Sequence, residues 1–134
     1  VFDINIRQHW YNREIVTASL RQADVLKLNE DELPLIASLL DIGKSGTEVI
    51  AELIQMFSLR YVIYTAGADH SEIHSAEGLL SHIPTPKVEV ADTVGAGDSF
   101  TAAFITDPIA ACHRKAVETA AKVCTIHGAI PRRP

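Results

Sequence analysis

The sequence predicts an α/β fold in which a mostly parallel sheet is flanked by helices. Short runs rich in β-branched and aromatic residues alternate along the chain with longer runs whose apolar residues recur at helical spacing. Strands that alternate with helices favour a parallel sheet. The 134 residues, 47% of them hydrophobic, are enough to build one domain around its own core. We therefore expect residues 1–134 to form a single domain.

The expected elements follow one another along the chain. Strands are predicted over residues 1–6, 24–29 and 60–67, as a pair with a turn near Glu77 and Gly78 over 71–84, and as a further strand or sheet edge over 87–93. Helices are predicted over residues 13–23, 30–43, 47–57, 97–105 and 112–128. We expect Gly43 to end the second helix and Thr47 to cap the third.

Composition excludes several classes of protein. The net charge of −5 argues against a nucleic-acid or membrane surface as partner. No apolar run reaches the roughly 20 residues that a membrane span needs, and no signal peptide is evident.

Cys112 and Cys124 are twelve residues apart in one predicted helix, about 18 Å, which is too far for a disulfide. Free thiols predict a cytoplasmic protein. The six histidines show no metal-ligand spacing, so no zinc site is expected.

The stretch ADTVGAGDSFTAAF, residues 91–104, is the most informative part of the sequence. It lies where a predicted strand passes into a predicted helix, and Gly95 and Gly97 leave the backbone there uncovered. The N–H groups of Ala96, Gly97 and Asp98 would then point outward at the helix start, as in anion-binding sites. The Asp98 carboxylate could accept the proton of a hydroxyl that attacks a phosphoryl group. The alternative is an ordinary capped turn.

Two phosphate-binding patterns are only partly matched. The dinucleotide fingerprint requires a third glycine where Phe100 stands. The P-loop pattern requires a glycine where Ser38 stands, five residues before Gly43. Neither motif is therefore predicted.

The same stretch resembles the signature of the ribokinase-like (PfkB-type) carbohydrate kinases. Four further segments resemble the family in the family's own order: FDINIRQHW, ADVLKLNEDEL, VIYTAGA and VCTIHGAIP. Within the family, the first and last of these look most like bacterial fructokinases. The resemblance implies a ribokinase-like fold, of which this chain is the C-terminal, nucleotide-binding and catalytic part. The family's chains are roughly twice as long, and their N-terminal half carries the lid and most sugar-binding residues.

The resemblance implies roles for individual residues in the signature stretch. Asp98 would be the general base, and the backbone of Gly95, Ala96 and Gly97 would form the anion hole. Asp92 matches the position associated with a monovalent cation, usually K⁺, although it could instead cap the loop.

The other matching segments imply the remaining site residues. Asn29 would lie near the ATP phosphates and Glu32 would organise Mg²⁺ through water, although Asn29 and Glu32 also fit a capping box. Thr65 and Gly67 would lie along ATP. His70 stands where the family commonly has a second glycine, which puts the contact of this loop with the nucleotide in question. Arg7 would meet substrate or phosphate oxygens or remain a solvated surface residue. Lys27 would have a similar role or be an ordinary lysine on a sheet edge.

The implied function is ATP-dependent phosphorylation of a sugar hydroxymethyl group, with fructose as first candidate. The alternatives are a kinase for 2-keto-3-deoxygluconate, another sugar or a nucleoside, and a non-catalytic binding protein of the same fold. The implied cofactors are ATP and Mg²⁺, with K⁺ as a further candidate, and a homodimer stays open for the intact protein. We expect residues 1–134 alone to be inactive. The segment over 104–117 is shorter than is usual in the family, and Asp107–Pro108 breaks it abruptly.

Overall fold

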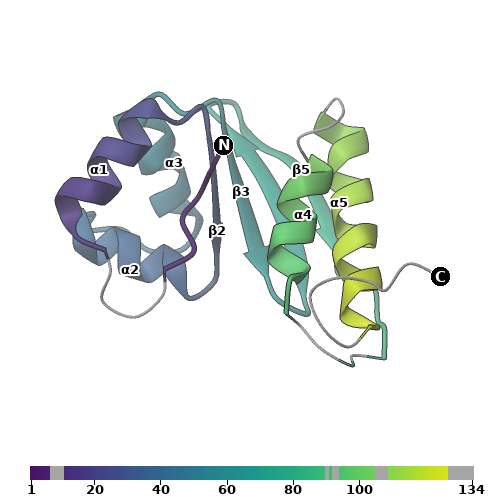
Figure 1. Ribbon diagram of the computed structural model, residues 1–134. Helices are drawn as coiled ribbons and strands as arrows, with labels where there is room; N and C mark the ends of the chain where they lie inside the picture. The colour runs from purple at the N-terminus through teal and green to yellow at the C-terminus, as the bar shows by residue number, and fades with distance from the viewer. Residues whose placement is uncertain (7–10, 90, 92–93, 105–108, 127–134) are drawn as a thin grey trace. The chain divides into compact units, whose positions relative to one another are not determined.

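The computed structural model describes residues 1–6, 11–89, 91, 94–104 and 109–126 (Figure 1). The strands are β1 (Phe2–Asp3), β2 (Val25–Asn29), β3 (Tyr61–Ala66), β4 (His70–Ser75) and β5 (Gly78–Pro84). The helices are α1 (Arg13–Gln22), α2 (Glu32–Leu39), α3 (Thr47–Phe57), α4 (Ala96–Phe104) and α5 (Ile109–Cys124). Contacts divide the chain into two compact units, one built on Val1–Gly67 and Ser71–His82 and the other mainly on α4 and α5.

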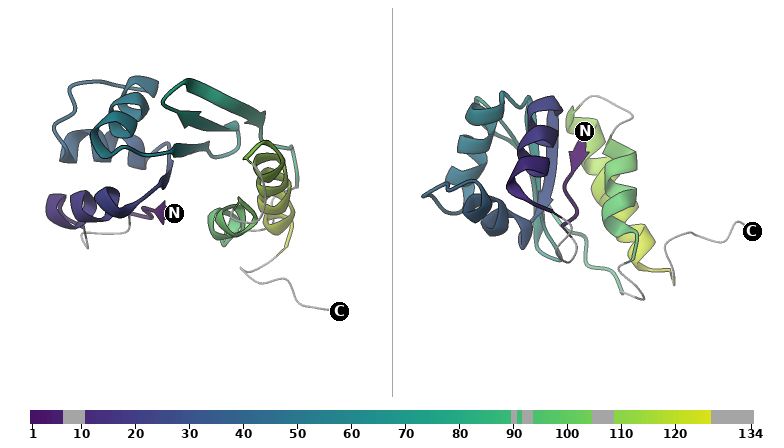
Figure 2. Two further views of the ribbon diagram at one scale, coloured as in Figure 1. Left: turned by 90° about the horizontal axis from the view of Figure 1, so that it is seen from above. Right: turned by 60° about the vertical axis from the view of Figure 1, so that its left-hand side comes forward.

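The first unit is built on three parallel strands. The sheet has the order β1-β2-β3-β4-β5, and both β1 with β2 and β2 with β3 are parallel. A parallel neighbour requires a crossover, which is supplied by α1 between β1 and β2 and by α2 and α3 between β2 and β3. The strand order advances in one direction, so right-handed crossovers place all three helices on one face (Figures 1 and 2). This half of the fold agrees with the predicted parallel α/β pattern.

The core of this unit lies between β2 and the three helices. Leu26 and Leu28 alternate along β2 and are fully buried. The helices contribute apolar side chains at helical spacing, which close this face of the sheet against water. The buried helical members are Val16, Leu20, Leu33, Ile36, Ala37, Val49, Ile50, Leu53 and Ile54.

The opposite face of β2 carries a buried charge. Lys27 is only 7% exposed, and its Nζ lies 2.9 Å from Oδ2 of Asp3, its partner on β1. Lys27 is therefore not the edge lysine that the sequence suggested, because β2 lies between β1 and β3. The ion pair offsets the cost of removing the ammonium group from water.

The other half of the sheet is a pair of hairpins. Short turns connect β3 to β4 and β4 to β5, so these neighbours run antiparallel. Gly78 begins β5 with φ +111°, a conformation that L side chains rarely adopt. The predicted pair of short strands with a turn near Glu77 and Gly78 is confirmed.

Some expected boundaries are wrong. The second helix ends at Leu39 and not at Gly43, because the chain turns through Asp41 at φ +57°. The third helix is capped by Gly46, at φ +57°, and not by Thr47. Thr47 is the first residue of the helix, and no side chain caps this end. Residues 87–89 form no strand, and the segment 87–93 continues into residues outside the described part of the chain.

The second unit is a pair of packed helices. Phe100 and Phe104 on α4 are buried, and the Phe100 ring meets His113 of α5 edge-on, with centroids 6.1 Å apart. Cys112 and Cys124 are both free, as predicted from their spacing on one helix. Residues 105–108, including the expected break at Asp107–Pro108, lie outside the described residues. Among the described residues, no helix combines the length and apolarity needed to cross a bilayer.

Candidate active site

The structure places two predicted site residues side by side at one edge of the sheet. Asn29 ends β2, and its Cα partner on β3 is Thr65. The Glu30 N–H donates to the carbonyl oxygen of Thr65 at 3.1 Å and continues the parallel pairing past the strand end. The carboxyl edge of a parallel sheet is the usual ligand-binding side of such folds. The position of both residues therefore suits a site there.

A complete capping box joins Asn29 to Glu32. Asn29 Oδ1 accepts the N–H groups of Asp31 at 3.0 Å and Glu32 at 2.9 Å. In return, Glu32 Oε2 accepts the N–H of Asn29 at 2.9 Å. These bonds satisfy backbone donors that the helix itself leaves unpaired. The structural role predicted for this pair is thus present, and the Nδ2 amide is the hydrogen-bond donor of the Asn29 side chain.

Glu32 also forms a hydrogen bond with the segment that follows β1. Its Oε1 accepts the N–H of Ile6 at 2.8 Å, and the residue is only 6% exposed. One carboxylate therefore links the segment after β1 to the end of β2. Sequence reasoning missed this link, because nothing local to Ile6 signals a partner 26 residues away. Arg7 follows directly and lies outside the described residues.

The double role of Glu32 leads to a stability prediction. Glu32→Gln offers one acceptor oxygen where the carboxylate has two, and its amide nitrogen would face a backbone N–H donor. We expect the free energy of unfolding to fall by about 2 kcal/mol, the usual cost of an unsatisfied buried group. Urea unfolding of the intact protein measures this change. Glu30→Gln, on the exposed neighbouring residue, is the matched control and should change stability by less than about 0.5 kcal/mol. Equal losses for both variants would contradict the assigned role.

Gly67 is favoured by its backbone conformation and has a close neighbour in Glu30. It has φ +46°, and a Cβ placed there would lie 3.0 Å from Oε1 of Glu30. Burial raises the pKa of nearby Tyr64, and the negative charges of Glu30 and Glu72 raise it further. The Tyr64 hydroxyl is therefore a neutral group at physiological pH. Glu30 is a further residue of this edge that the sequence analysis did not single out.

His70, which stands where the family commonly has a second glycine, is the first residue of β4. Its Nδ1 lies 2.9 Å from Oδ2 of Asp69, and the ring is partly buried. The turn between β3 and β4 therefore ends in an anchored side chain.

The glycine-rich segment forms the start of α4, as expected. Gly95 has φ +82°, and its carbonyl oxygen accepts the Ser99 N–H at 2.9 Å, which begins the helix. The N–H groups of Ala96, Gly97 and Asp98 therefore lie in the first turn, where a helix offers no acceptor of its own. Asp98 is exposed in this turn. Asp92 lies outside the described residues.

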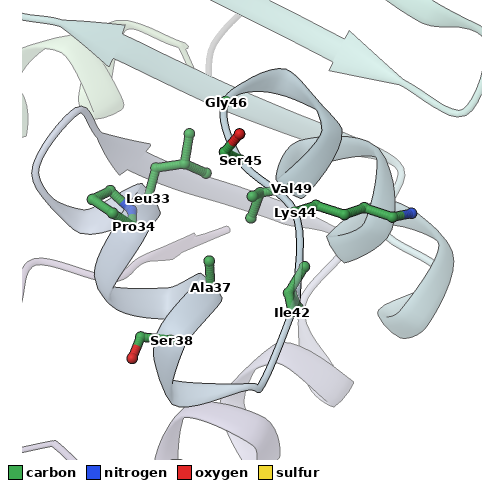
Figure 3. A pocket seen from close by; sticks show the side chains of 9 residues that line it. All are labelled: Leu33, Pro34, Ala37, Ser38, Ile42, Lys44, Ser45, Gly46 and Val49. Atoms are coloured by element: carbon green, nitrogen blue, oxygen red, sulfur yellow. The ribbon is translucent and has the colours of Figure 1, made fainter.

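A pocket of about 310 Å³ lies between α2 and the start of α3 (Figure 3). Its apolar lining residues are Leu33, Pro34, Ala37, Ile42 and Val49. The Lys44 side chain extends away from it in Figure 3, and its Nζ pairs with Glu52. Its lining includes Ser38, Lys44 and Ser45, where the sequence matches the P-loop pattern only in part, and none of the predicted site residues that the structure describes.

Comparison with known proteins connects these features to a family. The sequence pattern of the pfkB family carbohydrate kinases matches residues 1–134. A fructokinase from Klebsiella pneumoniae is 36% identical over 109 residues, which cover 78% of this chain and 34% of that protein. An aminoimidazole riboside kinase from Salmonella typhimurium is 31% identical over 110 residues, which cover 78% and 33%. The chain thus spans about a third of the length of the curated relatives it matches.

Solved structures agree with this assignment. The structure of aminoimidazole riboside kinase from Salmonella enterica, complexed with aminoimidazole riboside and an ATP analog, has a TM-score of 0.73 at 29% identity and covers 96% of this chain and 46% of its own. A nucleoside kinase from Methanocaldococcus jannaschii, an archaeal member of the ribokinase family, has a TM-score of 0.80 at 23% identity and covers 96% and 42%. The fold is ribokinase-like, as the sequence predicted, and the chain belongs to the pfkB family of carbohydrate kinases.

Proposed function

We propose that the protein carrying this chain transfers the γ-phosphoryl group of ATP to a hydroxymethyl group of a sugar, with fructose as first candidate. The observation that carries the proposal is the start of α4, where Asp98 lies beside backbone N–H groups that have no helical acceptor. In the proposed mechanism, Asp98 accepts the proton of the attacking hydroxyl. The Gly95–Gly97 backbone stabilises negative charge on the transferred group.

The edge of the first unit is the proposed contact for the nucleotide. Asn29 ends β2 and Thr65 lies one residue before the end of the parallel strand β3, and Gly67 follows in a turn at φ +46°, where a Cβ would lie 3.0 Å from the Glu30 carboxylate. The Asn29 Nδ2 amide is a donor suited to a phosphate oxygen. The Salmonella enterica relative was solved with an ATP analog, which supports ATP as the phosphoryl donor.

Glu32 fits a role toward Mg²⁺ through water. Both of its oxygens already accept a backbone N–H, and the residue is buried. Each carboxylate oxygen can accept a second hydrogen bond, so metal-bound water is a suitable donor. When bound, Mg²⁺ would neutralise phosphate charge. Asp92 remains the proposed K⁺ position and Arg7 the proposed contact for substrate or phosphate.

The substrate is the least constrained part of the proposal. The relatives include fructokinases, an aminoimidazole riboside kinase and a 5-dehydro-2-deoxygluconokinase from Bacillus anthracis. Fructose is preferred because the first and last matching segments look most like bacterial fructokinases. In this proposal, the chain is the C-terminal, nucleotide-binding part of a cytoplasmic enzyme that needs neither nucleic acid nor membrane. A homodimer is one arrangement for the intact protein.

The test is a substrate panel with the intact protein, ATP and Mg²⁺. The panel contains fructose, 2-keto-3-deoxygluconate, 5-dehydro-2-deoxygluconate, aminoimidazole riboside and a purine nucleoside. We expect fructose to give the highest kcat/KM, and residues 1–134 alone to give no turnover. A higher kcat/KM for another member would reassign the substrate. ATP and sugar binding without turnover would overturn the catalytic proposal in favour of a binding protein.

A further inference from the structure

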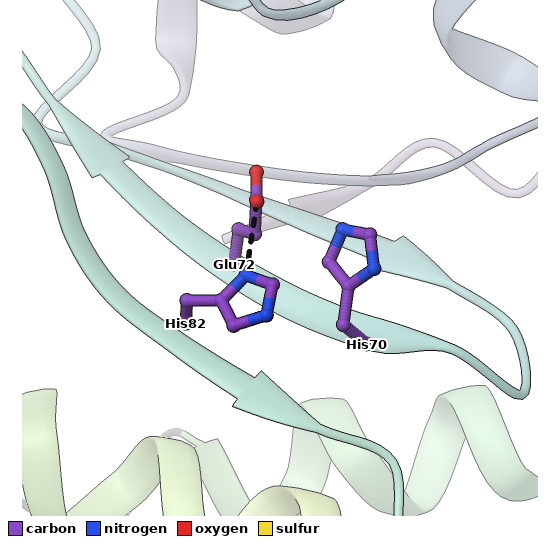
Figure 4. Close-up of side chains that lie close together, drawn as sticks. All are labelled: His70, Glu72 and His82. Carbon is purple, nitrogen blue, oxygen red and sulfur yellow. Dashed lines mark hydrogen bonds and ion pairs between the residues drawn. The ribbon is translucent and has the colours of Figure 1, made fainter.

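The β4–β5 hairpin gathers histidines around one carboxylate. Side chains alternate along a strand, so His70, Glu72 and His74 share one face of β4, whereas Ser71 and Ile73 point to the other. His82 on β5 reaches the same carboxylate (Figure 4), with Nδ1 3.1 Å from Oε1 of Glu72. The cluster was not expected from the sequence. Its cross-strand member is ten residues from Glu72 and is placed only by the hairpin register.

The geometry of three of these residues suits a metal ion. One ligand atom each from His70, Glu72 and His82 lie within 4.8 Å of one another. Zinc takes nitrogen and oxygen ligands at about 2.0–2.2 Å, so tetrahedral neighbours are about 3.3 Å apart. The Glu72–His82 pair is already at 3.1 Å, and small rotations of side chains would bring in the third ligand. Figure 4 shows the three side chains on adjacent strands of the hairpin.

Two neighbouring groups would orient these ligands. His74 Nε2 lies 2.7 Å from Oε2 of Glu72, which leaves Oε1 on the side of His82. The Asp69 carboxylate lies 2.9 Å from Nδ1 of His70, and a proton held on Nδ1 places the lone pair of the neutral ring on Nε2. Metal-binding histidines and carboxylates usually have such outer partners.

We propose that the β4–β5 hairpin binds one divalent transition-metal ion, with Zn²⁺ as the probe, through His70, Glu72 and His82. Two imidazoles and one carboxylate favour Zn²⁺ over Mg²⁺, which prefers oxygen ligands alone. Three protein ligands leave a fourth position for water. The inference is independent of the proposed kinase function, because it uses none of the residues assigned to phosphoryl transfer.

The test is calorimetric titration of the intact, nucleotide-free protein with Zn²⁺ in the presence of excess Mg²⁺. We expect one Zn²⁺ per chain. Glu72→Gln and His82→Gln should each weaken binding by at least about a hundredfold, and the positioning variant His74→Gln by about tenfold. Glu77→Gln, in the exposed turn of the same hairpin, is the matched control and should leave the dissociation constant unchanged.

Two measurements on the unsubstituted protein guard against a folding defect in the variants. Zn²⁺ should shift the imidazole NMR signals of His70 and His82 stoichiometrically. Binding should weaken in acidic buffer, because protons compete with the metal ion for its ligands. Absence of stoichiometric binding, unshifted His70 and His82 signals, or equal affinity in Glu72→Gln and wild type would each overturn the proposal. Turnover is not a readout, so failure here leaves the kinase proposal unaffected.

Discussion

Asp98→Asn in the intact protein should lower kcat by about 10²–10⁴-fold, the range that a general base contributes. Asparagine keeps the size of the side chain and its place in the first turn of α4, but it cannot take the proton of the attacking hydroxyl. The affinity for ATP should change little, because the proposed nucleotide contacts lie elsewhere, at Asn29, Thr65 and Gly67. Steady-state kinetics combined with calorimetric ATP titration separate the two effects.

The matched control is Asp24→Asn, which makes the same chemical change at an exposed position. The backbone carbonyl of Asp24 accepts the N–H of Arg60, so the substitution leaves that bond intact. This variant should retain the kcat of the wild type. If Asp98→Asn keeps more than about a tenth of wild-type kcat, Asp98 is not the base.

Asp3→Ala should cost about 3 kcal/mol of stability, the low end of the range for breaking a buried ion pair. The reason is the asymmetric burial of the pair. The Lys27 side chain is 8% exposed, whereas that of Asp3 is 24% exposed. Loss of Asp3 therefore leaves an ammonium group inside the sheet without its counter-charge. Urea unfolding of the intact protein, followed by circular dichroism, measures the loss.

Lys27→Met tests the explanation. Methionine fills similar space and carries no charge, and the carboxylate left behind is partly in water. We expect this variant to lose no more than about 1 kcal/mol, because replacing a buried charge by an apolar group is often neutral. A larger loss for Lys27→Met than for Asp3→Ala would show that packing of the lysine stem, and not the unpaired charge, dominates.

Much of the parallel half of the fold could be predicted, because its signals are local. The strand at 25–29 and the helix at 47–57 have clear periodicity over their whole length. The capping box between Asn29 and Glu32 is likewise readable from a spacing of three residues. The adjacency of Asn29 and Thr65 then follows from two parallel strands ending together.

The features that could not be predicted depend on partners distant in sequence. The burial of Lys27 follows from the position of β2 between two other strands, and the contact of Glu32 with Ile6 follows from the path of the chain after β1. The grouping of His70, Glu72 and His82 depends on the hairpin register. In each case the local sequence gives no signal, because tertiary structure alone brings the contacting residue close.

The shared carboxylate of Glu32 also gives this protein two built-in spectroscopic reporters. The amide protons of Ile6 and Asn29 donate to a charged oxygen instead of to a peptide carbonyl. Charge-assisted hydrogen bonds are stronger than neutral ones, so both resonances should be displaced downfield and exchange slowly with solvent. A metal ion held through water by the same carboxylate would weaken both bonds together. Occupancy could then be followed from two backbone signals, without any substitution or label in the site.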